Sequence, residues 1–213
     1  MKQKTAVMIY PFFSLQEITC LTSCLKIWEE REIDTYASSK AIVKSEEGFQ
    51  VTANKTFEEF EESAYDCLIL PGILNPMPAL FDAANIRFLE TLAGKDILIA
   101  SISSSPLLLA KAGLLKDKKF TVGIFEEMYP VFPFVPKENL VRTPVCKDGN
   151  LITAVGFAFK EFAIQTLRAL GIECRDDVLD GVYKEFTEEE LTFRMGEEGF
   201  KEFLDEYNKY LPQ

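Results

Sequence analysis

Three consecutive serines stand where a strand gives way to a helix. Residues 99–115 read IASISSSPLLLAKAGLL, so Ser103, Ser104 and Ser105 follow an apolar run and precede a helix-like pattern. A strand, a sharp turn and a helix form the geometry that presents a nucleophile in many hydrolases. Serine also caps helix N-termini, because its hydroxyl accepts a hydrogen bond from an exposed backbone amide. The pattern by itself therefore leaves both a catalytic site and a simple helix cap open.

The chain contains no histidine, and this limits the chemistry open to a serine. Histidine is the usual general base near neutral pH, and the common zinc sites depend on imidazole. A Ser-His or Cys-His mechanism within the chain is therefore excluded. The five cysteines are odd in number and form no Cys-x-x-Cys pair, so we interpret them as reduced, mostly buried thiols. We expect neither a metal ion nor a cofactor.

Charge and hydropathy exclude two classes of partner. The net charge is −11, and an acidic chain repels nucleic acid and anionic membranes. No apolar stretch approaches the ~20 residues of a membrane helix, and the N-terminus lacks the features of a signal peptide. We therefore expect a cytoplasmic protein without nucleic-acid or membrane partners.

Short apolar runs alternate with amphipathic stretches along most of the chain. Buried strands are predicted at 4–10, 32–39, 66–72 and 96–102, and helices at 14–30, 56–63, 78–94, 106–115 and 158–171. Hairpins are predicted around Glu47–Gly48 and around 147–149. Ser14 and Glu17 have the spacing of a capping box at the start of the first helix. This alternation favours a mainly parallel sheet that is covered on both faces.

Ligands bind such sheets at the carboxyl ends of the strands. Three strand ends are predicted to meet at that edge, and they carry Pro11, Gly72 and Ser103. The topology alone therefore places a candidate site around the three serines.

Several motifs in this order resemble the DJ-1/PfpI family of the class I glutamine amidotransferase-like superfamily. They are LILPG at 68–72, the stretch from Ile97 to Leu115, FTVG at 120–123 and DGNLITAVGFAFKEFAIQTLRALG at 148–171. The resemblance covers roughly residues 4–171. It implies a flavodoxin-like three-layer α/β/α sandwich with a mainly parallel sheet, and homodimers are common in the family. The expected domain is residues 1–172, with an acidic helical C-terminal extension at 173–213 packed on it.

By this resemblance Ser103 occupies the position of the family's nucleophilic cysteine. Glu17 matches the acidic residue that reaches from the first helix to that cysteine. Gly72 matches the first glycine of a Pro-Gly-Gly motif, and Ile73 stands where the second glycine lends its amide to an oxyanion hole. Ser105 replaces the glycine of the elbow. The remaining matches are Gly123, about where the family has a histidine, and Gly156 and Glu161 at the entry of the late helix.

Because the chain has a serine at the cysteine position and no histidine, we consider three functional hypotheses. The first is a protein without the family's Cys/His chemistry that binds a small anionic or carbonyl metabolite near Ser103, through Pro11, Gly72, Ile73, Ser104 and Ser105. The second is a serine-dependent hydrolase or amidase that uses Ser103 with Glu17, although an unperturbed glutamate with a pKa of about 4.3 is a weak base for an alcohol. The third is a stress-related chaperone or regulatory homodimer without catalysis.

One proline-rich segment has no place in the predicted sheet. MYPVFPFVP, at 128–136, interleaves apolar residues with prolines and would be costly if it were exposed. We interpret it as a lid over the site or as a contact with a partner subunit.

Overall fold

The computed structural model describes residues 4–179 and, farther along the chain, residues 196–198, 201 and 205. The chain divides into two compact units, Met1–Leu179 and Asp180–Gln213. The first unit contains the candidate site, and its end at Leu179 lies beyond the boundary predicted at residue 172. The predicted C-terminal extension lies almost entirely outside the described residues, so its packing stays a prediction.

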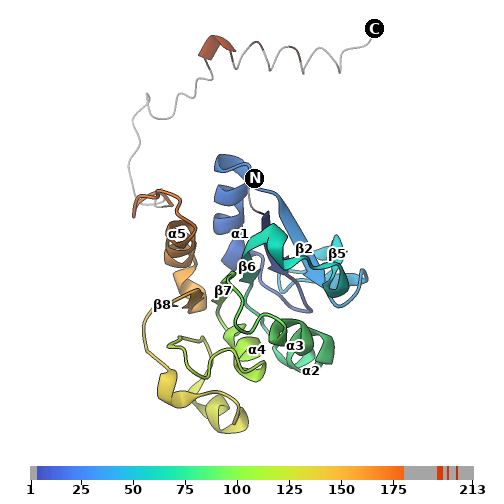
Figure 1. Ribbon diagram of the computed structural model, residues 1–213, viewed down its shortest axis with the longest axis vertical. Coiled ribbons are helices and arrows are strands. Elements are labelled where there is room, and N and C mark those ends of the chain that lie inside the picture. Colours follow the sequence, from blue (N-terminus) through green and yellow to red (C-terminus); the bar gives the residue numbers. More distant parts are fainter. Residues whose placement is uncertain (1–3, 180–195, 199–200, 202–204, 206–213) are drawn as a thin grey trace. The chain divides into compact units, whose positions relative to one another are not determined.

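A seven-stranded sheet forms the centre of the first unit (Figure 1). Its strands run in the order β5-β2-β1-β6-β7-β9-β8, and only β8 is antiparallel to its neighbour. Their bounds are β5 (Lys55–Thr56), β2 (Ile33–Ala37), β1 (Lys4–Met8), β6 (Tyr65–Leu70), β7 (Leu98–Ile102), β9 (Leu151–Ala154) and β8 (Val145–Asp148). The five central strands have the flavodoxin order. The predicted flavodoxin-like α/β fold is therefore confirmed.

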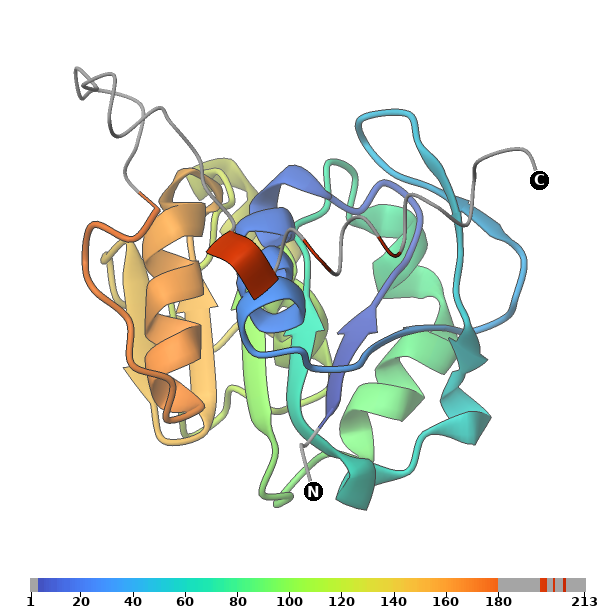
Figure 2. The same ribbon diagram turned by 90° about the horizontal axis from the view of Figure 1, so that it is seen from above.

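Helices cover both faces of the sheet, as Figures 1 and 2 show. On one face α1 (Gln16–Ser23) packs against α5 (Phe159–Ala169), and α1 continues as a π-helical turn at Cys24–Trp28. On the other face lie α2 (Met77–Phe81), α3 (Ala83–Glu90) and α4 (Pro106–Lys111). Because both faces are covered, β7 and β9 are buried along their whole length, which explains why their sequences are mostly apolar.

Two hairpins form where glycines permit the turn. The first joins β3 (Ile42–Lys44) to β4 (Gln50–Thr52) in a separate antiparallel pair, with Gly48 at φ +94°. The second joins β8 to β9, with Gly149 at φ +61°. Side chains with a Cβ rarely adopt such angles, so the sequence signal for both hairpins was direct.

Two predicted helices are interrupted. The stretch 78–94 divides into α2 and α3 because Asp82 has an extended backbone and accepts a hydrogen bond from the Ala84 amide at 2.9 Å. An aspartate that caps a helix must lie outside it, so Asp82 ends one helix and begins the next. The stretch 56–63 forms two short 3₁₀ turns, Phe57–Glu59 and Glu62–Ala64, instead of one helix.

The predicted capping box at Ser14 and Glu17 is wrong. The N-cap position of α1 is Leu15, and no side chain of α1 itself caps the helix. Instead, Glu47 from the β3–β4 hairpin accepts hydrogen bonds from the Gln16 amide at 3.0 Å and, more weakly, from the Ser14 hydroxyl at 3.4 Å. A tertiary contact therefore takes the role of the local one and leaves Glu17 available for another partner.

No helix in the described part of the chain is long and apolar enough to span a membrane.

Candidate functional site

Ser103 stands in a sharp turn between β7 and α4 with an unusual backbone conformation. Its φ is +63°, in the left-handed region that residues with a side chain adopt only at a cost of ~1–2 kcal/mol. Two backbone hydrogen bonds hold it there: the Ser103 amide donates to Ala154 O at 2.7 Å, and Ser103 O accepts from the Gly123 amide at 2.7 Å. The fold around Ser103 therefore holds a strained backbone in place.

The two following serines build the turn. The Ser105 side chain is fully buried, accepts from the Ile102 amide at 3.1 Å and lies within hydrogen-bond distance of Leu70 O and the Ser101 hydroxyl. The Ser104 hydroxyl donates to Ile73 O at 2.6 Å and so ties the turn to the segment after β6. Neither hydroxyl is free for a ligand, and Ser103 is the one serine of the three whose side chain is partly accessible.

The loop between β1 and α1 brings Glu17 to this turn. Phe13 pairs with Ile73 in an isolated antiparallel bridge, in which the Ser14 amide donates to Gly72 O at 2.8 Å. Helix α1 begins directly after this bridge and places Glu17 in its first turn, over Gly72. Pro11 lies on the same loop but is exposed to solvent.

Glycines leave the space that the Glu17 carboxyl occupies. A Cβ added at Gly72 would lie 1.7 Å from Glu17 Oε2 and 2.7 Å from Ser103 Cβ. A Cβ added at Gly156 would lie 2.4 Å from Glu17 Oε1 and 3.1 Å from Ser103 Oγ. Gly123 approaches the Ser103 backbone, where a Cβ would be 3.4 Å away. The structure thus brings Glu17, Ser103, Gly72 and Gly156 together.

The surroundings of Glu17 favour its neutral form. Burial and the nearby negative charge of Glu46 raise the pKa of Glu17 to about 7, although the Ser103 side chain and the Gly72 backbone oppose the rise. Oε2 is buried and has no hydrogen-bond partner among the described residues. A charged carboxylate with an unpaired buried oxygen is costly, whereas a protonated one can donate. Near neutral pH this carboxyl can therefore both accept and give up a proton.

Two backbone amides beside Ser103 are unpaired. The amides of Ile73 and Ser104 donate to no residue in the described part of the chain, since the neighbouring bonds go through Leu74 N, Ser105 N and the Ser104 hydroxyl. Unpaired amides close to a nucleophile are the donors that stabilise a carbonyl oxygen as it gains negative charge.

No local pattern in the sequence indicates that the β3–β4 hairpin takes part in this site. The sequence predicts Glu47 only as a turn residue and assigns no role to Glu46, yet Glu46 acts on Glu17 electrostatically and Glu47 caps α1. Only the tertiary structure brings them to the first helix.

Among residues 4–179 and the few described beyond them, no three acidic or cysteine side chains are close enough together to hold a metal ion.

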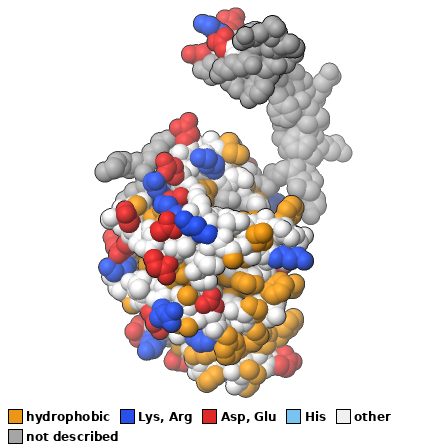
Figure 3. Space-filling model, turned by 90° about the vertical axis from the view of Figure 1, so that its right-hand side faces the viewer, with side chains coloured by type: hydrophobic (Ala, Val, Ile, Leu, Met, Phe, Trp, Pro, Cys, Tyr) orange, Lys and Arg blue, Asp and Glu red, His pale blue; other side chains and the backbone are white. Residues whose placement is uncertain are grey.

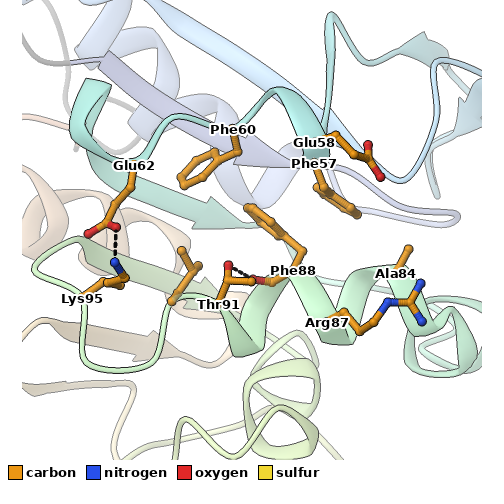
Figure 4. A pocket seen from close by; sticks show the side chains of 10 residues that line it. Phe57, Glu58, Phe60, Glu62, Ala84, Arg87, Phe88, Thr91 and Lys95 are labelled. Atoms are coloured by element: carbon orange, nitrogen blue, oxygen red, sulfur yellow. Dashed lines mark hydrogen bonds and ion pairs between the residues drawn. The ribbon is translucent and has the colours of Figure 1, made fainter.

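A separate groove lies between the segment 57–62 and the side of α3 and the turn after it (Figure 4). It has a volume of about 430 Å³ and an aromatic wall in which Phe57 and Phe88 stack at 4.4 Å between ring centroids. At one end Lys95 pairs with Glu62. Because Lys95 precedes β7 whereas Ser103 follows it, this groove is distinct from the Ser103 site.

The chain is similar in sequence to several known proteins. The family model described as the DJ-1/PfpI family matches residues 3–169. Among curated proteins, the chain is 26% identical over 150 residues to "Deglycase PfpI" of Pyrococcus furiosus, covering 69% of this chain and 80% of that protein. It is 28% identical over 130 residues to "Isonitrile hydratase" of Pseudomonas putida, covering 60% of this chain and 54% of that protein. It is 25% identical to "DJ-1 protein homolog E" of Arabidopsis thaliana over 76% of this chain, but it spans only 42% of that relative.

Solved structures share the fold. A DJ-1 superfamily protein from Agrobacterium tumefaciens matches with a TM-score of 0.73 at 22% identity, covering 84% of this chain and 95% of that one. DJ-1beta of Drosophila melanogaster matches with a TM-score of 0.65 at 22% identity, covering 82% and 100%.

At an ordinary φ, alanine stabilises a folded chain more than glycine does, but the strained backbone at Ser103 predicts the opposite order. Ser103→Gly and Ser103→Ala both remove the hydroxyl, but only glycine adopts a positive φ without cost. We expect the glycine variant to be about 0.5–1 kcal/mol more stable than the alanine variant in urea unfolding. At Ser104, which has an ordinary φ, the order should be reversed. Equal stability of the two Ser103 variants would show a relaxed turn.

The raised pKa of Glu17 predicts a loss of stability as pH rises. Between the ordinary value of 4.5 and about 7, the folded protein retains a proton that the unfolded chain has released. Glu17→Gln cannot ionise, so it should be about 1–2 kcal/mol more stable than the wild type at pH 8, allowing for solvent screening, and similar to it at pH 5. Urea midpoints at the two pH values test this. Glu90→Gln, on the exposed side of α3, is the control and should shift both midpoints alike.

Proposed function

The chain belongs to the DJ-1/PfpI family, and we propose that it binds a small, neutral carbonyl compound at Ser103 without cysteine chemistry. The observation that carries the proposal is the Glu17 carboxyl, held against Ser103 with a pKa of about 7. Glu17 matches the family's acidic residue and Ser103 its cysteine. The Glu17 carboxyl can donate or accept a hydrogen bond beside the Ser103 hydroxyl. The unpaired amides of Ile73 and Ser104 would hold the carbonyl oxygen.

Electrostatics favour a neutral ligand over an anionic one. The charges that act on Glu17 are those of Glu46 and Glu47, and both are negative. An anion would add a further negative charge beside them, whereas an aldehyde, ketone or amide would not. Of the two ligand classes expected from the sequence, the carbonyl class therefore fits this site better.

The two buried thiols, Cys24 and Cys67, do not substitute for the missing nucleophile. Burial raises the pKa of the Cys24 thiol to about 11, and it raises the pKa of Cys67 further. Reactive cysteines instead have a lowered pKa and partial exposure. We therefore do not extend the activities named for the Pyrococcus and Pseudomonas relatives to this chain.

A serine-dependent hydrolase or amidase is the second candidate, and the same carboxyl supports it. A base works best when its pKa lies near the working pH, and Glu17 is much closer to neutrality than an ordinary glutamate. Glu17 would take the proton of Ser103 Oγ as the oxygen adds to the carbonyl carbon. It would then return the proton to the leaving group of an ester or amide or, with an aldehyde, to the new alkoxide, giving a hemiacetal.

A homodimer remains our expectation for the assembly. Large hydrophobic side chains are exposed at Leu74, Phe81, Phe125 and Val131, and each is more than half accessible. Figure 3 shows hydrophobic side chains gathered over the lower part of one face, whereas charged side chains lie mainly above them. Surfaces of this kind suit a protein partner, and a second copy of the chain is the simplest one.

Carbonyl binding can be tested with acetaldehyde labelled with ¹³C at the carbonyl carbon. NMR titration should give a dissociation constant in the millimolar range, on the order expected for so few ligand atoms. Ser103→Ala should weaken binding at least tenfold because it removes the hydroxyl at the carbonyl carbon. Ser63→Ala, an exposed serine in a 3₁₀ turn, is the matched control and should bind as the wild type does.

Binding that is equally strong in Ser103→Ala would contradict the proposal. Hydrolysis of 4-nitrophenyl acetate separates the two candidates. A release of nitrophenolate that disappears in both Ser103→Ala and Glu17→Gln would favour the hydrolase. Aldehyde binding without such turnover would favour the binding protein.

A further inference from the structure

A second cavity is lined in part by two chain segments that also contribute to the Ser103 site. Its volume is about 240 Å³, and its walls come from residues 121–122, Tyr129, 140–144 and the pair Val155 and Phe157. This is slightly below the ~300–1,000 Å³ typical of pockets for drug-sized ligands, so it suits one small group.

Residues of two cavity walls are neighbours in sequence of glycines that contact Ser103. Val155 and Phe157 flank Gly156, whose position lies against Ser103 Oγ. Thr121 and Val122 immediately precede Gly123, whose amide donates to Ser103 O at 2.7 Å. Two of the cavity's walls therefore continue the two segments that enclose the serine.

The cavity is largely apolar and carries no unbalanced charge. Val122, Tyr129, Leu140, Val155 and Phe157 contribute apolar surface. The charged wall residue, Arg142, pairs with Glu126 at 2.6 Å. Tyr129 is 5% exposed and its hydroxyl donates to no residue that the structure describes, so it remains available as a polar contact.

The proline-rich segment predicted as a lid or an interface contributes one residue, Tyr129, to the wall of this cavity. The 3₁₀ helix Glu126–Val131 supplies Tyr129, and the buried side chains of Phe132 and Val135 anchor the segment to the core. Phe157, by contrast, is 82% exposed and stands at the rim. An exposed aromatic side chain beside an apolar cavity is suited to contact a ligand that enters it.

We propose that this cavity receives the substituent of the carbonyl compound bound at Ser103, and that the preferred substituent is an uncharged apolar ring. The inference rests on the proposed function and adds the class of ligand. With the carbonyl group held at Ser103, the ring would lie between Val155, Tyr129 and Phe157.

The test compares two aldehydes of different size, benzaldehyde and acetaldehyde, in the same NMR titration. The wild type should bind benzaldehyde at least tenfold more tightly than acetaldehyde, because the ring adds apolar contact area. Phe157→Ala should reduce this preference several-fold and leave acetaldehyde binding unchanged. Ile27→Ala removes a side chain that is 71% exposed in the π-helical turn after α1 and does not line the cavity, so it is the matched control and should leave both affinities unchanged.

A variant that fills the cavity gives an independent readout. Thr143 is exposed at the cavity wall, so Thr143→Phe should fold normally and exclude benzaldehyde while acetaldehyde still binds. Equal affinity for the two aldehydes in the wild type, with binding still dependent on Ser103, would overturn the inference and leave the proposed function intact. A preference that persists in both Phe157→Ala and Thr143→Phe would overturn it as well. Failure of both aldehydes to bind in a Ser103-dependent way would overturn the proposed function and this inference together.

Discussion

The site depends on a single steric constraint: the Glu17 carboxyl fits beside Ser103 only because the segments around it carry no side chains. A Cβ at Gly72 or at Gly156 would fall within 2.4 Å of a carboxyl oxygen. The first loop must also pair with residues 72–74, because that bridge sets where α1 begins. The parallel sheet brings these segments to one edge, and the strained turn at Ser103 completes the arrangement. The fold, the pairing of the first loop and the positions of the glycines are therefore all needed for the contact between the Glu17 carboxyl and Ser103.

That contact determines which chemistry remains in a chain without histidine and without a cysteine at the turn. The carboxyl is held near its neutral form by burial and by the acidic hairpin next to it. The same acidic hairpin makes the site unfavourable for anions. What remains is a hydroxyl, a carboxyl that titrates near neutrality and two unpaired amides, a set of groups that matches a neutral carbonyl group better than an anionic ligand.

Strong local signals made the fold predictable, whereas the site was only partly so. Apolar runs ended by proline or glycine marked β1 and β6. Gly48 and Gly149 marked the hairpins, because residues with a side chain rarely adopt their backbone angles. The capping box at Ser14 failed because Glu47, distant in sequence, caps α1 instead. The interruption at Asp82 was missed because the apolar period continues across it. Topology placed Ser103 at the candidate site, and resemblance to a family added Glu17. The pKa of Glu17 and the role of Glu46 depend on three-dimensional proximity that no local pattern contains.

The most direct measurement is a titration of the Glu17 side-chain carboxyl by ¹³C NMR from pH 4 to pH 9, with Glu17→Gln to assign its resonance. The account predicts a midpoint at about 7, well above the ordinary value of 4.5, and a lower midpoint in Glu46→Gln. A midpoint near 4.5 that is unaffected by Glu46 would mean that the carboxyl is an ordinary solvated anion. The neutral carbonyl site proposed around Ser103 would then be contradicted.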